Sequence, residues 1–525
     1  MTALRPLRRL RRAPLAWALG IAAVGITLYV VVGPLWVARY PMMTDLPFHT
    51  ACSSIFRHYL DPAWHFREQF TLQPLAVPYL ALYVVAALLM VVLPTMLAMK
   101  TAIALLLGLL PVGLGVMFWG MRKSPLLGLW GLALVWCGLT SWGFLNFMAA
   151  LGLFALVVGL TLRLLDRPSR ALQLGLGAAL CGVFFSHIFR FPFALCAVVG
   201  TAVVMLPATR RLRPIVLPLL VPLALLGLWW WLRPAALGGE MGALRLEPKR
   251  LDEVGGYLYR SFRDPAEQRA ATHALHVLGW VAAAAAALFV AQRRLARRRW
   301  RELWWGIGVT VVPLCCAAVF LLLYLMLPMQ VGVWWYVYPR EITAAAFVAL
   351  GALPDLPRQS SVKALFVAAM ASAVVPLGRV AIDNYAKFDA ATRDFDAVVR
   401  QLPPAPKLLY LVFDHTGSTA INTPFIHLPA YVQAMRGGWL SFHFAGWGAA
   451  PLSYRRPSDP GAIVPPPTPL RWEWTPERFR VLQHGPFFDW FLVRSRRTPD
   501  DLFRADPSIA RVAHEGTWWL YRRVN

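Results

Sequence analysis

Twelve long apolar segments, separated by short polar or basic stretches, dominate residues 15–381 of this sequence. A helix of about 20 apolar residues crosses the hydrocarbon core of a bilayer. The composition agrees with such helices, because only 15% of the residues are charged, whereas soluble domains average about 25%. We therefore predict an α-helical polytopic membrane protein. The candidate spans are 15–37, 74–93, 97–119, 126–140, 144–162, 171–188, 191–207, 214–232, 272–291, 303–327, 342–354 and 362–381.

Basic clusters between the apolar segments predict which loops face the cytoplasm. The clusters lie at 5–12, 163–170, 210–213, 293–301 and 358–363. This pattern places the N-terminus in the cytoplasm and the loops 38–73, 233–270 and 328–341 outside. The loop 233–270 carries several acidic residues, among them Glu240 and Glu253, and we expect an amphipathic helix on the membrane surface there.

The topology also restricts the number of spans. Between the outer loop 38–73 and the basic cluster at 163–170 the sequence has four apolar segments, whereas this topology requires an odd number. Either one segment between 74 and 140 is re-entrant or interfacial, or the segment boundaries are wrong. If Arg122 and Lys123 face the cytoplasm, the error lies within 74–119. We expect about 11 spans, with 13 as the alternative.

The first apolar segment has the position of a signal peptide, directly after a basic N-terminus. It is longer than a signal h-region, and no small-residue cleavage site follows it. We therefore expect an uncleaved anchor. The strong positive-inside bias and the absence of organelle signals favour a bacterial inner (plasma) membrane, with the C-terminal region in the periplasm.

The net charge of +26 comes from 52 Lys and Arg residues against 26 Asp and Glu residues. In a soluble protein this excess would suggest a nucleic-acid partner, but here the basic clusters set topology and no nucleic-acid motif is present. Five of the six cysteines lie in apolar runs, and only Cys52 lies in a polar loop. This pattern predicts neither a metal motif nor a disulfide framework.

Residues 383–525 contain no span and predict a small soluble α/β domain on the outer face, after a membrane module at 1–382. Apolar runs bounded by turn residues predict strands, and amphipathic runs predict helices. We expect helices at 384–401 and 498–503, strands at 407–413 and 489–494, a proline-rich loop at 451–469 and a terminal hairpin at 511–523.

The loop 38–73 gathers most of the ionisable groups that lie near the predicted outer membrane face. Asp45 precedes Pro47, so it marks a helix start. Its carboxylate has two explanations, a catalytic role or simple N-capping. His49 lies in the first turn of that helix and could approach Asp45, or it is an interfacial polar residue. The remaining His and acidic residues of the loop have no tight metal-ligand spacing.

Two further sites combine cationic and aromatic residues at predicted outer ends of spans. Arg340 and Tyr338 stand in VGVWWYVYPREIT, where an arginine could hold a phosphate bidentately. The alternative is an aromatic belt with a snorkelling arginine, and the adjacent Glu341 could neutralise Arg340. His187 and Arg190 lie in the tight turn SHIFRFPF, where polar groups need partners. The turn around Ser141, Trp142 and Asn146 is a similar candidate.

With these residues in place, the chain resembles the membrane glycosyltransferases of the GT-C type. These enzymes combine many spans with an acidic residue in the first outer loop and often a C-terminal soluble domain on the same side. Asp45, in TDLPFH, occupies the position of the catalytic acidic residue, and Arg340, in YPRE, resembles the arginine that meets the lipid phosphate. The ending FFDWFLVRS…EGTWWLYRR also resembles the closing strands of some members. Many members carry a paired acidic motif where this chain has one acid, so a divalent metal cofactor is neither indicated nor dismissed.

The resemblance implies transfer of a sugar from a polyprenyl-phosphate donor to a lipid or glycan acceptor at the outer face, with inversion. Asp45 would act as general base and Arg340 would stabilise the leaving phosphate. His49, His187, Arg190 and Tyr338 would bind the substrates.

Two other classes remain as alternatives. A transporter or flippase for a lipid-linked glycan would place ionisable residues within the spans, near the midplane. A non-catalytic scaffold would tolerate Asn or Ser in place of Asp45.

Overall fold

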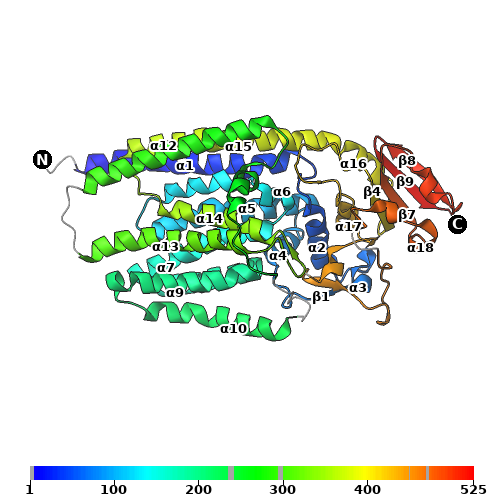
Figure 1. Cartoon of the computed structure of the whole chain (residues 1–525), viewed down its shortest axis with the longest axis horizontal. Helices are drawn as coiled ribbons and strands as arrows, with labels where there is room; N and C mark the ends of the chain where they lie inside the picture. Colours follow the sequence, from blue (N-terminus) through cyan, green and yellow to red (C-terminus); the bar gives the residue numbers. More distant parts are fainter. Residues whose placement is uncertain (1–4, 234–241, 294–299, 449, 469–471, 525) are drawn as a thin grey trace.

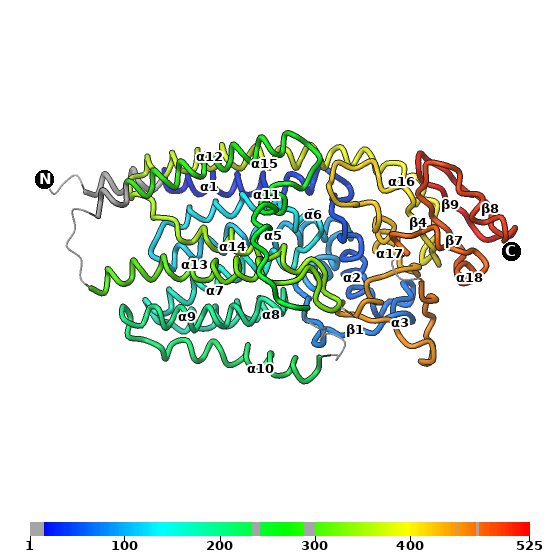
Figure 2. The backbone as a smooth tube through the Cα atoms, viewed as in Figure 1, coloured from blue at the N-terminus to red at the C-terminus, as the bar shows by residue number. Residues whose placement is uncertain are grey.

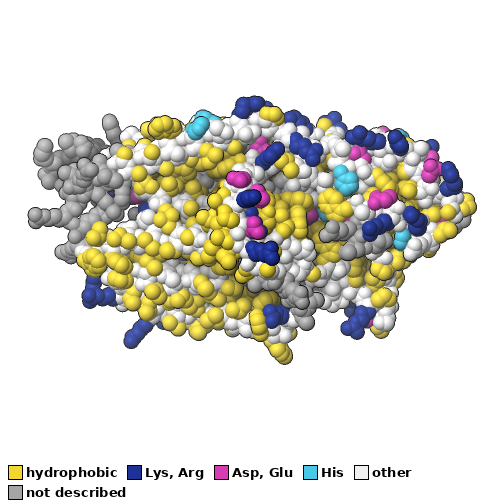
Figure 3. All heavy atoms as spheres, viewed as in Figure 1, with side chains coloured by type: hydrophobic (Ala, Val, Ile, Leu, Met, Phe, Trp, Pro, Cys, Tyr) yellow, Lys and Arg dark blue, Asp and Glu magenta, His cyan; other side chains and the backbone are white. Residues whose placement is uncertain are grey.

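The computed structural model describes residues 5–233, 242–293, 300–448, 450–468 and 472–524. The molecule is elongated, with a bundle of long helices at one end and a C-terminal sheet at the other (Figure 1). Apolar side chains cover most of the bundle on the face drawn in Figure 3, whereas charged side chains gather towards the C-terminal part. This distribution is expected of a membrane-embedded bundle that carries an extramembrane domain.

Eight helices within the described residues are long and apolar enough to cross a membrane. They pack side by side along the long axis (Figure 1). Helix α10, at the lower edge of the bundle in Figure 1, exposes Leu220, Val221 and Trp231, as a lipid-facing helix does. The eight helices are α1 (Arg5–Val37), α5 (Thr95–Gly120), α7 (Leu145–Asp166), α9 (Phe191–Thr209), α10 (Val216–Leu232), α12 (Pro265–Arg293), α13 (Trp300–Met326) and α15 (Ser360–Ala391).

Three further segments run from one end of the bundle to the other, although they are shorter or irregular. They are α8 (Arg170–Ser186), the 3-10 segment η2 (Pro125–Leu134) followed by α6 (Gly138–Trp142), and α14 (Val337–Ala349) followed by η7 (Leu350–Ala352). Lys123, before η2, donates to the carbonyl oxygen of Leu353, after η7, at 2.5 Å. At the opposite end the rings of Trp142 and Trp335 lie 4.9 Å apart. Counted with the eight long helices, these three segments would correspond to the eleven passes that the sequence predicts.

The predicted span at 74–93 is wrong, and it accounts for the conflict in topology. Its helix, α4 (Ala81–Leu89), has nine residues. Lys100, in the second turn of α5, donates to the carbonyl oxygen of Ala38 at the end of α1. Because α5 thus starts at the end of the bundle that carries the first loop, α4 remains at that end and does not cross.

The predicted helical span at 126–140 crosses mainly as 3-10 helix, for a packing reason. A side chain at Gly128 would meet the carbonyl oxygen of Pro111 in α5 at 2.4 Å, and one at Gly131 would meet Leu110 at 2.9 Å. The glycines therefore allow η2 to lie directly against the backbone of α5. This close contact replaces the regular helix that apolar length alone predicts.

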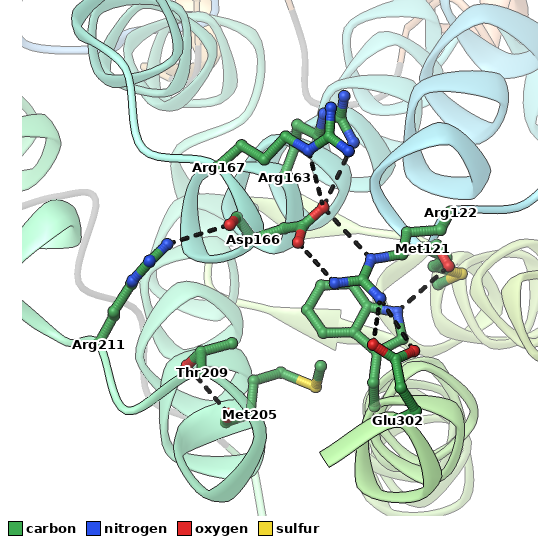
Figure 4. Close-up of polar contacts among 10 residues, drawn as sticks. Met121, Arg122, Arg163, Asp166, Arg167, Met205, Thr209, Arg211 and Glu302 are labelled. Atoms are coloured by element: carbon green, nitrogen blue, oxygen red, sulfur yellow. Dashed lines mark hydrogen bonds and ion pairs between the residues drawn. The ribbon is translucent and has the colours of Figure 1, made fainter. Parts of the chain in front are cut away.

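A network of arginines and acids ties the helices together at the end of the bundle opposite the first loop (Figure 4). Asp166 accepts hydrogen bonds from Arg122 (2.6 Å) and Arg163 (3.4 Å). Arg122 also bonds to Glu302 at 3.2 Å. Arg122 and Arg163 therefore lie at the same end, as positive-inside topology expects.

The loop 233–270 forms short pieces rather than one long surface helix. Within its described residues these are η6 (Pro248–Glu253) and α11 (Val254–Tyr259), before α12 begins at Pro265. Glu240 lies outside the described residues. Tyr257 of α11 packs against Tyr336 and Tyr338, so this segment contacts the start of α14.

The C-terminal region forms a five-stranded sheet in the order β5-β4-β7-β9-β8, with β4, β5 and β7 parallel and β8 and β9 antiparallel to their neighbours. The predicted strands, the short helical turn at 498–503 and the terminal hairpin are confirmed, while β5 and α17 were not predicted. The predicted loop at 451–469 is wrong at its start, where β6 (Leu452–Tyr454) forms a strand. The α15 helix continues unbroken past the predicted boundary at 382, and α16 follows it. The elements are α16 (Arg393–Val399), β4 (Lys407–Val412), α17 (Ala430–Arg436), β5 (Trp439–Leu440), β7 (Trp490–Arg494), η10 (Asp500–Phe503), β8 (Ile509–Glu515) and β9 (Trp518–Arg523).

Successive side chains of the strands point to opposite faces of this sheet. Leu408 and Tyr410 join the large core that continues into the bundle. Leu409 and Leu411 join a second core built around Trp472. One face of the sheet therefore packs against the core that continues into the bundle, and the other face is covered by the second core.

The first loop belongs structurally to this C-terminal domain. Its strand β1 (Phe70–Leu72) pairs with β6 (Leu452–Tyr454) in an antiparallel ladder, and its helix α2 (Leu46–His58) packs against α17. Figure 2 shows the blue first loop lying among the orange segments of the domain. The first loop and the C-terminal domain, far apart in the sequence, thus form one unit at the end of the bundle.

Candidate functional site

Asp45 stands at the N-cap position of α2 but does not act as a cap. Pro47 starts the helix as expected, yet the Asp45 side chain makes no capping hydrogen bond. Its Oδ1 instead lies 3.5 Å from Nε2 of His427 in the C-terminal domain, and the side chain is 19% exposed. Simple capping therefore does not account for this carboxylate.

The turn from Trp142 to Phe144 contacts both main candidate residues, Asp45 and Arg340. The Asp45 amide donates to the carbonyl oxygen of Trp142 at 3.0 Å, and the Arg340 guanidinium lies over the Phe144 ring, 4.2 Å from its centroid. Between them, Gly143 has φ +103° and would place a Cβ only 3.3 Å from Cβ of Asp45. The structure thus brings Asp45 and Arg340 to one short turn between α6 and α7.

Arg340 is held by neutral groups. Its Nη2 donates to the carbonyl oxygen of Trp335 at 2.8 Å, and its Nη1 donates to Nε2 of His187 at 3.3 Å. No carboxylate of a described residue lies within ion-pair distance of it. Its positive charge is therefore available to an anionic ligand.

Glu341 does not neutralise Arg340 but pairs with Arg190. The two side chains form a close ion pair and are 6% and 3% exposed. The rings of Phe147 and Phe320 lie 4.8 and 4.9 Å from the Arg190 guanidinium. Arg190 is therefore enclosed and charge-balanced, whereas its neighbour in space, Arg340, is not.

His187 connects Arg340 to the short segment before α4. Arginine can only donate, so Nε2 of His187 is an unprotonated acceptor. The Tyr79 hydroxyl also lies 3.3 Å from Nε2. Asn146 fixes this segment, because its Oδ1 accepts from the Leu82 amide at 2.9 Å.

His49 lies one helical turn after Asp45 and faces Tyr83. Its Nδ1 is 2.8 Å from the Tyr83 hydroxyl. Burial lowers the pKa of His49 to about 4, against a hydrogen bond with the Gly143 backbone that raises it. The imidazole is therefore neutral at physiological pH, and it borders Asp45 without adding a charge.

Burial favours the protonated form of the Asp45 carboxyl. Burial raises its pKa from 3.8 to about 7, while the charge of Arg340 acts in the opposite direction. A group that gains and loses a proton near neutral pH is suited to general base catalysis. The site therefore combines a titratable carboxylate with an unbalanced cation.

Tyr338 points to a different group of residues. Its hydroxyl donates to Oε2 of Glu253 at 2.9 Å and lies 3.0 Å from the Tyr257 hydroxyl. A cleft of about 620 Å³ lies beside this group, lined among others by Glu253, Trp142 and Tyr336. The structure thus places Asp45, His49 and Arg340 against the turn at 142–144, with His187 bonded to Arg340. Tyr338 instead contacts Glu253 and Tyr257, two residues that line the cleft.

Among the described residues, no group of three or more His, Cys, Asp or Glu side chains is placed to hold a metal ion. At the site itself Asp45 and His427 are the adjacent donors. A metal at this position would need further ligands from a substrate or from water.

His427 is the site residue that the sequence did not indicate. It precedes α17, far along the chain from Asp45, in the apolar context PFIHLPA. No spacing or motif singles it out. Only the packing of the domain against α2 brings it to the carboxylate.

The fold and the site define a polytopic membrane protein with an extramembrane α/β domain and an acid–arginine site at their junction. No protein-family model matches the chain, and no curated protein does. Among solved structures, the crystal structure of ArnT from Cupriavidus metallidurans in the apo state is similar, with 14% identity and a TM-score of 0.45 over 98% of both chains. Similarity at this level carries over no residue role.

Proposed function

We propose that this protein is a membrane glycosyltransferase of the GT-C type. It would transfer a sugar from a polyprenyl-phosphate donor to a lipid or glycan acceptor. The observation that carries the proposal is the pairing of Asp45, a partly exposed carboxylate that titrates near neutral pH, with Arg340, a guanidinium that lacks a carboxylate partner. Such a pair offers a base for the acceptor and a cation for the leaving phosphate.

In this reaction Asp45 takes the proton of an acceptor hydroxyl as that oxygen attacks the anomeric carbon. The new carbon–oxygen bond forms while the bond from the anomeric carbon to the phosphate oxygen breaks. The polyprenyl phosphate leaves with the bonding electrons, and Arg340 stabilises its charge. This single displacement inverts the anomeric centre, and the proton ends on Asp45.

The other predicted residues support these two. His187 holds Nη1 of Arg340 and thereby directs the guanidinium towards the phosphate. His49 borders the acceptor side of Asp45. Arg190 would act indirectly, by keeping Glu341 away from Arg340, and Tyr338 would bind substrate from the adjoining cleft, whose volume suits a ligand of moderate size.

The same observations weigh against a transporter or flippase. Such proteins carry ionisable residues near the bilayer midplane. In the described spans Asp166, Glu267 and Glu302 lie in end turns. The acidic residues further from a helix end, Glu341 and Asp383, are paired with Arg190 and Arg379. A scaffold is less favoured for another reason, since the Asp45 side chain makes no capping bond that would explain it.

The orientation follows from charge. The end of the bundle that carries the arginine network would face the cytoplasm, which places the N-terminus there. The site and the C-terminal domain would then face the periplasm of a bacterial inner membrane, where lipid-linked sugars and membrane lipids are accessible.

The test compares the wild type with Asp45→Asn for sugar transfer from a panel of polyprenyl-phosphate sugars. Asn keeps the volume but cannot take a proton, so we expect a loss of at least about a hundredfold. Asp61→Asn is the matched control, because Asp61 lies in the same loop and does cap, accepting from the Ala63 amide at 3.1 Å. Equal activity in wild type and Asp45→Asn would remove Asp45 as the base. Absence of transfer in every protein with every donor would favour a flippase.

A further inference from the structure

His427 is enclosed by aromatic rings from both α2 and the C-terminal domain. Its ring centroid lies 4.7 Å from that of Phe48 and 5.5 Å from that of Phe444, with Phe442 stacked at 6.4 Å. Its side chain is 4% exposed. The ring is therefore fixed in an apolar enclosure whose one polar contact among the described residues is Asp45.

The enclosure also decides which nitrogen carries the proton. Burial lowers the pKa of His427 to about 3, so the ring is neutral and has one N–H. Nδ1 is buried and has no hydrogen-bond partner among the described residues. We assign this proton to Nε2, because a proton on Nδ1 would have no acceptor among the described residues, whereas Nε2 lies 3.5 Å from Oδ1 of Asp45.

We infer that His427 is a positioning residue that holds the Asp45 carboxylate and stabilises its ionised form through the Nε2–H group. The C-terminal domain therefore completes the site directly, by supplying a donor to the base. A contact of 3.5 Å is long for a hydrogen bond, and contacts of this kind tighten when substrate closes a site. The inference rests on the proposed function for the meaning of Asp45 as a base, but not for the contact itself.

The other ionisable groups that act on Asp45 come from three elements. Arg340 faces it from α14 and favours its ionised form. His49 lies one turn further along α2, and Tyr83 of α4 senses the charge of Asp45. His49 and Tyr83 are neutral at physiological pH. Among the neutral groups, His427 is the one with a ring nitrogen 3.5 Å from a carboxylate oxygen of Asp45.

The experiment measures that protonation directly. The full chain is titrated in detergent by infrared spectroscopy, and the carboxyl band of Asp45 is identified by its absence in Asp45→Asn. His427→Phe fills the aromatic enclosure but removes the donor. Because a hydrogen bond to the charged form lowers a carboxyl pKa, we expect this variant to raise the midpoint by about one pH unit. His427→Gln restores a donor and should return the midpoint towards that of the wild type.

His443→Phe is the matched control. His443 is as buried as His427 and lies 5.4 Å from the same Phe48 ring, but its Nε2 is 3.8 Å from Sγ of Cys52. The His443→Phe variant should leave the midpoint of the Asp45 titration unchanged. If His427→Phe does not fold, the wild type and His427→Gln are compared with His427→Leu by the same titration.

An unchanged or lowered midpoint in His427→Phe would overturn the inference, and so would an equal rise in His443→Phe. The infrared titration needs no substrate, so it separates this inference from the proposed function. If the midpoint moves as expected while no donor is used, His427 still positions Asp45 and the glycosyltransferase proposal fails alone. If transfer is observed but the midpoint does not move, the proposed function stands and His427 only packs.

Discussion

The pH dependence of transfer follows from the environment of Asp45. A general base works only when ionised, and burial raises the pKa of this carboxyl to about 7. With that value about one tenth of the protein is active at pH 6 and about one hundredth at pH 5. We therefore expect kcat/KM to be flat above about pH 8 and to fall tenfold per pH unit below about pH 6.

The assay is transfer of a labelled sugar by purified protein in detergent at constant ionic strength. The imidazoles near Asp45 cannot cause this fall in kcat/KM, because burial lowers the pKa of His49 to about 4 and that of His427 to about 3. A limb with its midpoint near pH 4, or constant activity down to that pH, would refute the assignment of Asp45 as a buried base.

The same pKa shift has a consequence for stability, with a definite sign. The folded-state pKa lies above the ordinary value of 3.8, so the folded state binds the proton more tightly than the unfolded state. Stability from this group is fully present below about pH 4 and is lost as the pH rises to about 7. Three pH units correspond to roughly 4 kcal/mol. Asp45→Asn should therefore unfold at a higher temperature than the wild type at pH 8, by a margin that disappears towards pH 4.

Two further variants test the rest of the site. Arg340→Gln should lower kcat by about a hundred- to a thousandfold through loss of phosphate stabilisation, and Arg340→Lys should recover part of the rate. Arg190→Gln should instead lower stability by about 3–5 kcal/mol, because it leaves Glu341 buried without a partner, and the double variant with Glu341→Gln should recover much of it; a lowered kcat in a stable Arg190→Gln protein would contradict this division. Gly143→Ala should reduce both kcat and stability. The φ of +103° at this position is strained for alanine by about 1–3 kcal/mol, and the added Cβ would lie against Asp45. Normal kinetics in Gly143→Ala would show that the turn does not position the carboxylate.

Apolar length and charge predicted most of the fold, and the exceptions have a common physical cause. The eight long helices follow from hydropathy. The structures of the segments at 74–93 and 126–140 were not predicted. In the first case apolar length does not distinguish a crossing helix from one that remains at the bundle end. In the second case the glycines of η2 allow a backbone contact that stabilises a 3-10 segment. Such contacts depend on a partner helix that a single sequence does not identify.

The candidate residues could be named from the sequence, but their arrangement could not. Asp45 and Arg340 were predicted because each is an ionisable residue at the outer end of an apolar segment. The expectation that Glu341 could neutralise Arg340 fails for a geometric reason. Adjacent residues on a helix point about 100° apart, so Glu341 turns to Arg190 while Arg340 turns to the 142–144 turn. Helix geometry predicts that the side chains of Arg340 and Glu341 diverge, but it does not predict which of them lies near Asp45.

The location of α2 explains why the soluble domain cannot be separated from the site. One side of its first turn is fixed by the bundle, through the bond from Asp45 to Trp142. The other side is fixed by the C-terminal domain, through the packing of Phe48 against His427. The carboxylate therefore lies between two bodies, and a shift of either one changes its distance to Arg340 or to His427. A base and a leaving-group cation must be held in precise positions to be effective, so under the proposed function the ladder between β1 and β6 would contribute to catalysis. It fixes the first loop to the domain, so that the domain and the bundle together set the geometry of the proposed reaction.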